Sequence, residues 1–303
     1  MSVLICGSLA FDTISTFDGR FAQQILPDQL HILNVSFLVP TLKREFGGCA
    51  GNIAYGLHQL GGQPVVMAAL GVDGASYRER MQQWGVSLEH VLTVTESHTA
   101  QAIIITDQDN NQITAFHPGA MQFADQLVIK PDVGVQLAII GPDGRDAMIQ
   151  HARQLADAKI PFVFDPGQGL PMFDGDDLKR FISQATWVAV NDYEGKMLAD
   201  RTGQSLADIS KSSHLKGLIE TLGAEGCNVY IQGEKTHVAG VKAAAVLDPT
   251  GCGDAFRGGL LYGLSKGWDL VKSVGLANRM GALKIAVSGP QNYTVDRAAL
   301  LAG

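Results

Sequence analysis

Short runs of apolar residues recur along this chain, and several of them are apolar at every position rather than at alternate positions. They occupy residues 3–6, 65–70, 137–140, 162–164, 187–190 and 229–231. A strand that is apolar throughout must be buried on both faces, as in a parallel sheet that helices cover on both sides. Helical patterns fall between the runs, over residues 52–60, 146–158, 192–198 and 206–222. The alternation predicts an open, doubly wound, mostly parallel α/β sheet flanked by helices.

Two stretches break this alternation. Residues 13–46 read as loop and strand with no convincing helix, and residues 99–118 read as a hairpin around Asp109-Asn110-Asn111. We expect two inserted segments, about 13–46 and 96–118, to form a small β-sheet lid on a single α/β domain that spans residues 1–303. A lid over the carboxyl edge of the main sheet would exclude water from a reaction there.

Composition narrows the class of protein. The chain has 303 residues, 46% of them hydrophobic, which is enough for the core of one large domain. Its net charge is −7 and its lysines and arginines do not cluster, which argues against a nucleic-acid partner. The apolar runs are far shorter than the roughly 20 residues of a membrane span, and residues 1–7 read as a core strand rather than a signal peptide. The four cysteines lack C-x-x-C spacing, so we expect no disulfide or zinc site and a cytoplasmic location.

Polar and glycine-rich segments follow several of the predicted strands. They are Gly7-Ser8 with Asp12, and residues 165–168, 191–194, 221–226 and 248–254. Each alone could be an ordinary turn, since glycine and aspartate dominate turns. Ligands of open α/β sheets bind beyond the carboxyl ends of the strands, so segments of this kind at one edge predict a binding site.

The segment DPTGCGDAF, residues 248–256, lies between an apolar stretch, 241–247, that reads as a strand and a predicted helix over 255–264. The backbone N–H groups of Gly251, Cys252 and Gly253, with the positive helix end, would stabilise a phosphoryl group. Asp254, on the first helical turn, could accept a proton from a substrate hydroxyl. Helix capping is the alternative, but serine or threonine would cap without the entropy cost of two glycines.

Two further motifs are weaker by themselves. Asn191 and Glu194 could organise Mg²⁺ through water, although an asparagine cap with a glutamate three residues later is also a frequent capping box, and spacing alone favours the cap. In the glycine cluster at residues 46–52, Gly48 could let a sugar approach the backbone, and Asn52 could bind one of its hydroxyls.

Together these segments resemble the ribokinase family, the PfkB-type carbohydrate kinases. The late signature of that family, D-T-x-G-A-G-D, is similar to residues 248–254, its G-G-x-x-x-N run matches 47–52, and its N-x-x-E motif matches 191–194. Proline replaces the threonine after Asp248, and cysteine replaces the alanine between the glycines. Within the family the chain resembles bacterial adenosine kinases over residues 7–12, 36–40, 47–57, 116–121 and 248–259. The resemblance covers nearly the whole chain and implies a ribokinase-like fold.

The resemblance implies an ATP-dependent nucleoside kinase that transfers the γ-phosphoryl group of ATP to the 5′-hydroxyl of a ribonucleoside. Asp254 would be the general base, and the N–H groups of residues 251–254 would form the anion hole. Asp12 would bind the ribose 2′- and 3′-hydroxyls and Phe116 would stack on the base, in a nucleoside site made of Ser8, Asp12, Ser36, Gly48, Asn52, Phe116 and Gln168. The remaining implied residues are Asn191, Thr221, Gly223, Gly226, Gly251, Gly253 and Asn278 for ATP, Asn191 and Glu194 for Mg²⁺ through water, and Asp248 and Thr250 for a monovalent cation such as K⁺. Lid-mediated dimers occur in this family, so a homodimer is expected.

The chain departs from adenosine kinases around the base. Ala102 stands where an aromatic residue is expected, and Gly169 and Met172 stand where a second glutamine and an arginine are expected. A pocket with fewer polar groups rejects fewer analogues, so we expect a nucleoside kinase that accepts adenosine, inosine, guanosine and cytidine. A sugar or sugar-phosphate kinase of the same family, or a catalytically inactive nucleoside-binding regulator, are the alternatives.

Overall fold

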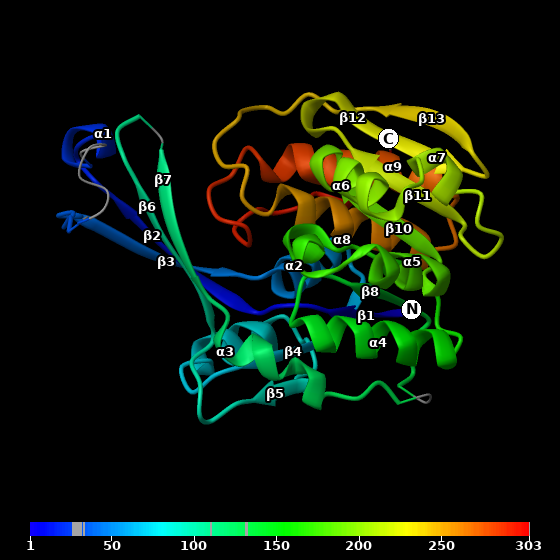
Figure 1. The fold of residues 1–303 in the computed structure, drawn as a ribbon, viewed down its shortest axis with the longest axis horizontal. Helices are drawn as coiled ribbons and strands as arrows, with labels where there is room; N and C mark the ends of the chain where they lie inside the picture. The colour runs from blue at the N-terminus through cyan, green and yellow to red at the C-terminus, as the bar shows by residue number, and fades with distance from the viewer. Residues whose placement is uncertain (26–31, 33, 110, 131–132, 303) are drawn as a thin grey trace.

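The computed structural model describes residues 1–25, 32, 34–109, 111–130 and 133–302, and within this part of the chain a nine-stranded sheet forms the centre of the molecule (Figure 1). Its strands are β1 (Ser2–Cys6), β4 (Gln63–Leu70), β5 (Val91–Thr93), β8 (Leu137–Ile140), β9 (Phe162–Phe164), β10 (Trp187–Asn191), β11 (Gly217–Thr221), β12 (Gly226–Ile231) and β13 (Glu234–Ala239). Their order is β13-β12-β11-β10-β9-β8-β1-β4-β5. Strand β12 is antiparallel to β11 and β13, and the other neighbours run parallel, so the predicted mostly parallel sheet is confirmed.

Two hydrophobic cores lie on opposite faces of this sheet. Successive residues of β1 alternate between them: Val3 and Ile5 belong to one core, and Leu4 belongs to the other. This alternation is why the strand is apolar at every position. The first core contains residues of α2 (Cys49–Gln59), α3 (Ala75–Gln83), α8 (Cys252–Ser265) and α9 (Leu270–Lys284), with α10 (Arg297–Ala302) packed beside it.

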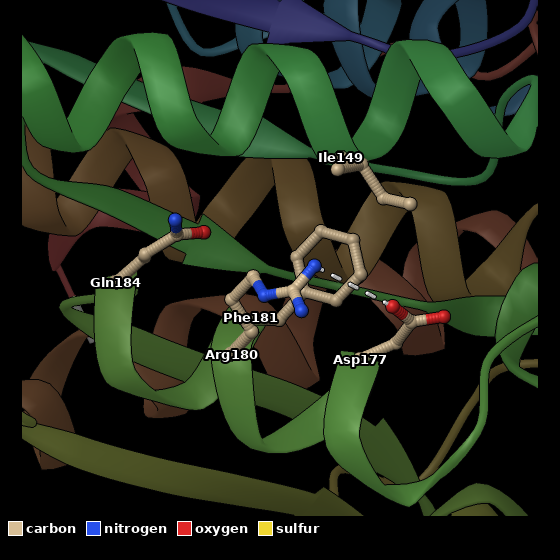
Figure 2. A pocket seen from close by; sticks show the side chains of 5 residues that line it. All are labelled: Ile149, Asp177, Arg180, Phe181 and Gln184. Atoms are coloured by element: carbon tan, nitrogen blue, oxygen red, sulfur yellow. Dashed lines mark ion pairs between the residues drawn. The ribbon is translucent and has the colours of Figure 1, made fainter.

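The second core lies under α4 (Arg145–Asp157), α5 (Gly175–Gln184), α6 (Asp192–Thr202) and α7 (Leu206–Ile209). In α5 the buried Leu178, Phe181 and Ile182 recur at helical spacing, and the Asp174 side chain caps the helix by accepting from the N–H groups of residues 176 and 177. A small hollow between α4 and α5 is lined by Ile149, Asp177, Arg180, Phe181 and Gln184 (Figure 2). It lies between helices, not at the strand ends.

A four-stranded sheet extends away from the body as the predicted lid (Figure 1). It comprises β2 (Ala10–Thr16), β3 (Thr41–Gly47), β6 (Ala100–Thr106) and β7 (Gln112–His117), in the order β3-β2-β6-β7. The hairpin predicted over 99–118 is confirmed as β6 and β7; Asn110 of its turn lies outside the described residues, as do residues 26–31 and 33 of the other inserted segment. A short helix, α1 (Phe21–Gln24), was not expected there.

Two predictions about secondary structure are wrong. Residues 206–222 are not one helix: α7 ends at Ile209, and residues 217–221 form β11, whose apolar residues are buried between β10 and β12. Residues 241–247 are not a strand, and Val246 and Leu247 are mostly exposed. Residues 217–221 and 241–247 are both short, so their pattern cannot separate strand, helix and loop without the packing partners.

Short 3-10 helices connect several elements: η2 (Gly119–Gln126), η3 (Gly167–Met172) and η4 (Gly223–Glu225). All four cysteines are free thiols. Among the described residues, the helices are all too short or too polar to cross a membrane.

Candidate active site

The carboxyl end of β1 meets the start of α2. The backbone N–H of Cys49 donates to Ser8 Oγ at 3.2 Å, and the N–H of Ala50 donates to the Ser8 carbonyl at 3.0 Å. Gly48, the N-cap of α2, has a φ of 82°, and a Cβ there would lie 2.5 Å from the Ser8 carbonyl oxygen. A side chain at this position is therefore excluded by both conformation and space. The predicted residues Ser8 and Gly48 lie together beside Asn52, one helical turn further along α2.

Asp254 and Asn52 meet across the two helices that begin at this edge. Asn52 Nδ2 donates to Asp254 Oδ2 at 2.8 Å. Helix α8 starts at Cys252 with Gly251 as its N-cap in the left-handed conformation, φ 78°. Among the described residues, the N–H groups of Gly251, Gly253 and Asp254 have no protein acceptor, whereas the N–H of Cys252 donates to the Pro249 carbonyl at 3.1 Å. N–H donors without an acceptor at the positive end of a helix are the arrangement on which anions bind in proteins.

A chain of hydrogen bonds fixes the orientation of Asn52. Gln291 Nε2 donates to Asn52 Oδ1 at 2.9 Å, and Arg80 Nε donates to Gln291 Oε1 at 3.2 Å. Because Oδ1 of Asn52 is the acceptor, its Nδ2 must be the group that donates to Asp254. Gln291 also donates to the Tyr77 hydroxyl, which donates to the Gly47 carbonyl. Arg80, Gln291 and Tyr77 were not predicted from the sequence, because no local motif surrounds them.

A buried ion pair lies beneath the start of α8. Arg257 donates from Nε and Nη2 to the two carboxylate oxygens of Asp165, each at 2.9 Å, and both side chains are buried. Arg257 Nη1 would lie 3.4 Å from a Cβ added at Gly253, so the guanidinium is close to the loop at residues 251–254, whose N–H groups could bind an anion. Residues 165–168 were predicted to lie at the sheet edge, whereas Arg257 was not predicted to be part of the site.

The predicted nucleotide segments follow β10 and β11, whose last residues, Asn191 and Thr221, are paired in register. Asn191 and Glu194 form a complete capping box at the start of α6, as spacing alone favoured. Gly226 has a φ of 100°, and a Cβ there would lie 2.2 Å from the Val238 carbonyl oxygen, so only glycine fits. Asn278 lies beside this segment, but its Nδ2 donates to the carbonyls of residues 238 and 239 and its Oδ1 accepts from Cys227, so it positions the segment.

One face of the lid sheet carries the predicted nucleoside residues. Glu45, Asp12, Ala102 and Phe116 are direct cross-strand partners in that order, so their side chains share a face. A Cβ added at Gly47 would lie 2.4 Å from Asp12 Oδ2, which places the Asp12 carboxylate over the glycines at the base of the lid. Phe116 is 55% exposed, so its ring is free to stack on a ligand.

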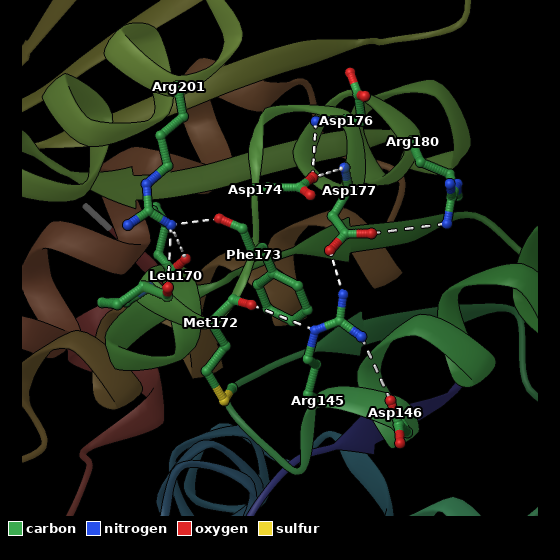
Figure 3. Close-up of polar contacts among 11 residues, drawn as sticks. Arg145, Asp146, Leu170, Met172, Phe173, Asp174, Asp176, Asp177, Arg180 and Arg201 are labelled. Atoms are coloured by element: carbon green, nitrogen blue, oxygen red, sulfur yellow. Dashed lines mark hydrogen bonds and ion pairs between the residues drawn. The ribbon is translucent and has the colours of Figure 1, made fainter.

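The segment η3 holds Gln168, Gly169 and Met172 at the edge of the main sheet. Arginines from two helices bind its backbone (Figure 3): Arg201 donates to the carbonyl oxygens of residues 170, 171 and 173, and Arg145 Nε donates to the Met172 carbonyl at 3.3 Å. Gly169 is buried, and Gln168 is exposed. Ser36 lies exposed in the segment that leads into β3, and the structure records no hydrogen bond between it and the other described site residues.

Burial and charge repulsion raise the pKa values of two carboxylates at the site, Asp254 and Asp12. Burial raises the pKa of Asp254 to about 6, although the hydrogen bond from Asn52 works in the opposite direction, and the charge of Asp165 adds to the rise. Burial likewise raises the pKa of Asp12 to about 6, with a further contribution from Glu45. Two carboxylates with raised pKa values at one sheet edge are typical of a catalytic site.

A family model described as pfkB family carbohydrate kinase matches residues 21–297. A nucleoside kinase from Burkholderia thailandensis, solved in complex with inosine, is 51% identical with a TM-score of 0.88, covering 99% of this chain and 96% of that chain. The same protein in complex with ADP-inosine gives 53% identity, a TM-score of 0.86 and coverage of 99% and 94%. A nucleoside kinase of Methanocaldococcus jannaschii is 29% identical over 241 residues, which are 79% of this chain and 78% of that protein.

An anion site and a carboxylate with a raised pKa, at the ligand edge of a doubly wound sheet that carries a small β-sheet lid, define a small-molecule kinase of ribokinase-like fold. The family match spans most of the chain, and the close structural relative spans nearly all of it. The chain belongs to the PfkB family of carbohydrate kinases, and the predicted family, fold and kinase class are confirmed.

Proposed function

We propose that this kinase transfers the γ-phosphoryl group of ATP to the 5′-hydroxyl of a ribonucleoside. The observation that carries the proposal is the Asp254 carboxylate, which Asn52 holds at 2.8 Å beside the free N–H groups of residues 251, 253 and 254. The similarity to nucleoside kinases solved with inosine and with ADP-inosine supports this choice of substrates.

In the proposed mechanism the 5′-hydroxyl oxygen attacks the γ-phosphorus of ATP while Asp254 accepts the hydroxyl proton. The bond between the γ-phosphorus and the β–γ bridging oxygen breaks, and ADP leaves. The free N–H groups at the start of α8 stabilise the charge on the transferred phosphoryl group, and Asp12 holds the ribose hydroxyls. Each carboxylate oxygen of Glu194 accepts one hydrogen bond from Asn191 and keeps a lone pair, so this pair fits a water-mediated Mg²⁺ site. Bound Mg²⁺ would neutralise phosphate charge.

The test is ADP release from magnesium ATP with a panel of acceptors: adenosine, inosine, guanosine, cytidine, ribose and fructose 6-phosphate. We expect turnover with several nucleosides and little with the sugars, because the carboxylates of Asp12 and Glu45 share the lid face with Phe116, and Lys43 on that face is already paired with Glu45. Preference for ribose or fructose 6-phosphate would make this a sugar kinase. Nucleoside binding without ADP formation would make it a regulator.

Substitution Gly169→Gln should narrow the choice of base. A Cβ at this position would lie 3.1 Å from Met172 Cε and 3.5 Å from Met148 Sδ, which are flexible groups that can move aside. The new amide would add a hydrogen-bonding group that discriminates between bases, so the ratio of kcat/KM between adenosine and the poorer nucleosides should change by about tenfold or more. Gly275→Gln is the control, since a Cβ there meets nothing within 4 Å. Unchanged ratios in Gly169→Gln would place the base elsewhere.

The pH dependence follows from the two raised pKa values. Asp254 must be ionised to accept a proton, so kcat/KM should fall as the pH drops through about 6, the value to which burial raises its pKa. Protonation of Asp12, whose pKa burial also raises to about 6, should weaken ribose binding over the same range. Initial rates measured from about pH 5 to pH 9 test this. A rate that stays constant down to the acid end would exclude Asp254 as the base.

We also propose that the chain forms one α/β domain with its lid and that it acts in the cytoplasm. Two copies of the chain would pair through their lids. Strands β3 and β7 are the edges of the lid sheet, and Leu42 and Ile113 on them are 70% and 40% exposed. Unpaired strand edges with exposed apolar side chains favour association with another chain. Light scattering after size exclusion should give twice the mass of the 32.2 kDa chain. A monomer mass at assay concentration would contradict this arrangement.

A further inference from the structure

Lys284, the last residue of α9, has a completely buried side chain. Its ammonium donates hydrogen bonds to the carbonyl oxygens of Asp248, at 2.8 Å, and Val287, at 3.0 Å. The Oδ2 atom of Asp248 lies 3.6 Å from the same nitrogen. A buried ammonium is strongly disfavoured unless it is paired and hydrogen-bonded, so these oxygens form a binding position for one positive charge.

Hydrogen bonds and packing connect this binding position to the proposed anion-binding loop, residues 251–254. The Asp248 carboxylate accepts hydrogen bonds from the backbone N–H groups of Thr250, at 2.9 Å, and Gly289, at 2.8 Å. Pro290, the next residue, packs against Gly251, where an added Cβ would lie 2.6 Å from Pro290 Cβ. The residues around the ammonium therefore set the path of the chain into the N-cap of α8, whose N–H groups face the proposed phosphoryl site.

The resemblance to the ribokinase family implies a monovalent cation at Asp248 and Thr250, and the structure does not fit that expectation. Carbonyl and carboxylate oxygens are the donors that such an ion would use, but the Lys284 ammonium already binds those of Asp248. We propose that Lys284 is a positioning residue whose ammonium takes the place of a bound monovalent cation, so that the kinase works at full rate without K⁺. An ammonium group and K⁺ carry the same charge and both bind oxygen atoms.

The first experiment uses the unmodified protein. ADP release is measured with magnesium ATP and nucleoside in tetramethylammonium buffer, with and without KCl at matched ionic strength. We expect rates that agree within about twofold, and stimulation by K⁺ of about tenfold or more would overturn the proposal. This arm rests on the proposed function. If no buffer supports ADP release, the proposed function fails. Thermal unfolding in the same buffers then tests the proposal on Lys284, because the unfolding midpoint of the unmodified protein should not change with K⁺.

Substitution Lys284→Ala should create the cation dependence that the unmodified protein lacks. It removes the ammonium and leaves the oxygens and the space around them. We expect turnover without small cations to fall about tenfold or more, and K⁺ or NH₄⁺ to restore it and to raise the unfolding midpoint of this variant. A simple packing defect would not respond to the kind of cation added.

Two further variants separate charge from packing. Lys284→Met keeps most of the side-chain volume without the charge, so it should lose activity and K⁺ should not restore it. Lys272→Met, at an exposed position of the same helix, should match the unmodified protein in every buffer. The proposal is wrong if Lys284→Ala keeps its full rate in tetramethylammonium buffer, or if K⁺ changes neither its rate nor its unfolding midpoint.

Discussion

Replacement of Asp254 with asparagine should lower kcat for nucleoside phosphorylation by a factor of about 10²–10⁴, the usual contribution of a positioned general base. The asparagine oxygen can still accept the hydrogen bond from Asn52, so the substrate site keeps its shape. Single-turnover measurement of ADP formation separates this chemical step from substrate binding and product release. Asp146→Asn, at an exposed acid on the first turn of α4, is the matched control and should keep the full rate.

The same variant should fold at least as well as the unmodified protein. Because burial raises the pKa of Asp254 to about 6, the folded protein binds that proton more tightly than the unfolded chain does. Folding is therefore favoured below the unfolded pKa and loses this contribution as the pH rises through about 6, so the ionised carboxylate destabilises the fold at pH 8. An equal or higher unfolding midpoint with a lost rate is the expected pair of results. An unchanged rate would show that another group accepts the proton.

Replacement of Arg257 with methionine should lower the free energy of unfolding by about 3–5 kcal/mol, because it leaves the Asp165 carboxylate buried without its partner. That loss is a large part of the roughly 5–15 kcal/mol that stabilises a typical domain. Denaturant unfolding monitored by circular dichroism measures it.

A second substitution tests the cause of this loss. Adding Asp165→Asn to Arg257→Met removes the unpaired charge and should recover part of the stability. Lys211→Met is the control, because Lys211 and Asp208 form an exposed ion pair whose loss should cost no more than about 1 kcal/mol. A loss of stability in Arg257→Met as small as in this control would mean that the buried pair contributes little.

The secondary-structure predictions that the structure confirms depend on local patterns. The strand at residues 137–140 and the start of α8 before Asp254 are visible because burial on both faces and helix-start chemistry depend on neighbouring residues. The strand β11 was read as helix because its apolar residues carry no period that separates the two. Arg257 and Gln291 were missed because their partners, Asp165 and Asn52, are distant in the chain.

The α/β class of the fold and the glycine segment before Asp254 could be predicted from the sequence alone, because strand burial and helix-start chemistry depend on a few neighbouring residues. The kinase class followed from the resemblance to the PfkB family. The structure was needed to show which N–H groups lack an acceptor at the start of α8, how Asn52 is oriented toward Asp254, and that the Lys284 ammonium binds the Asp248 carbonyl. The physical reason is that hydrogen bonds and ion pairs between distant segments depend on how the layers pack, and that packing has no local signature.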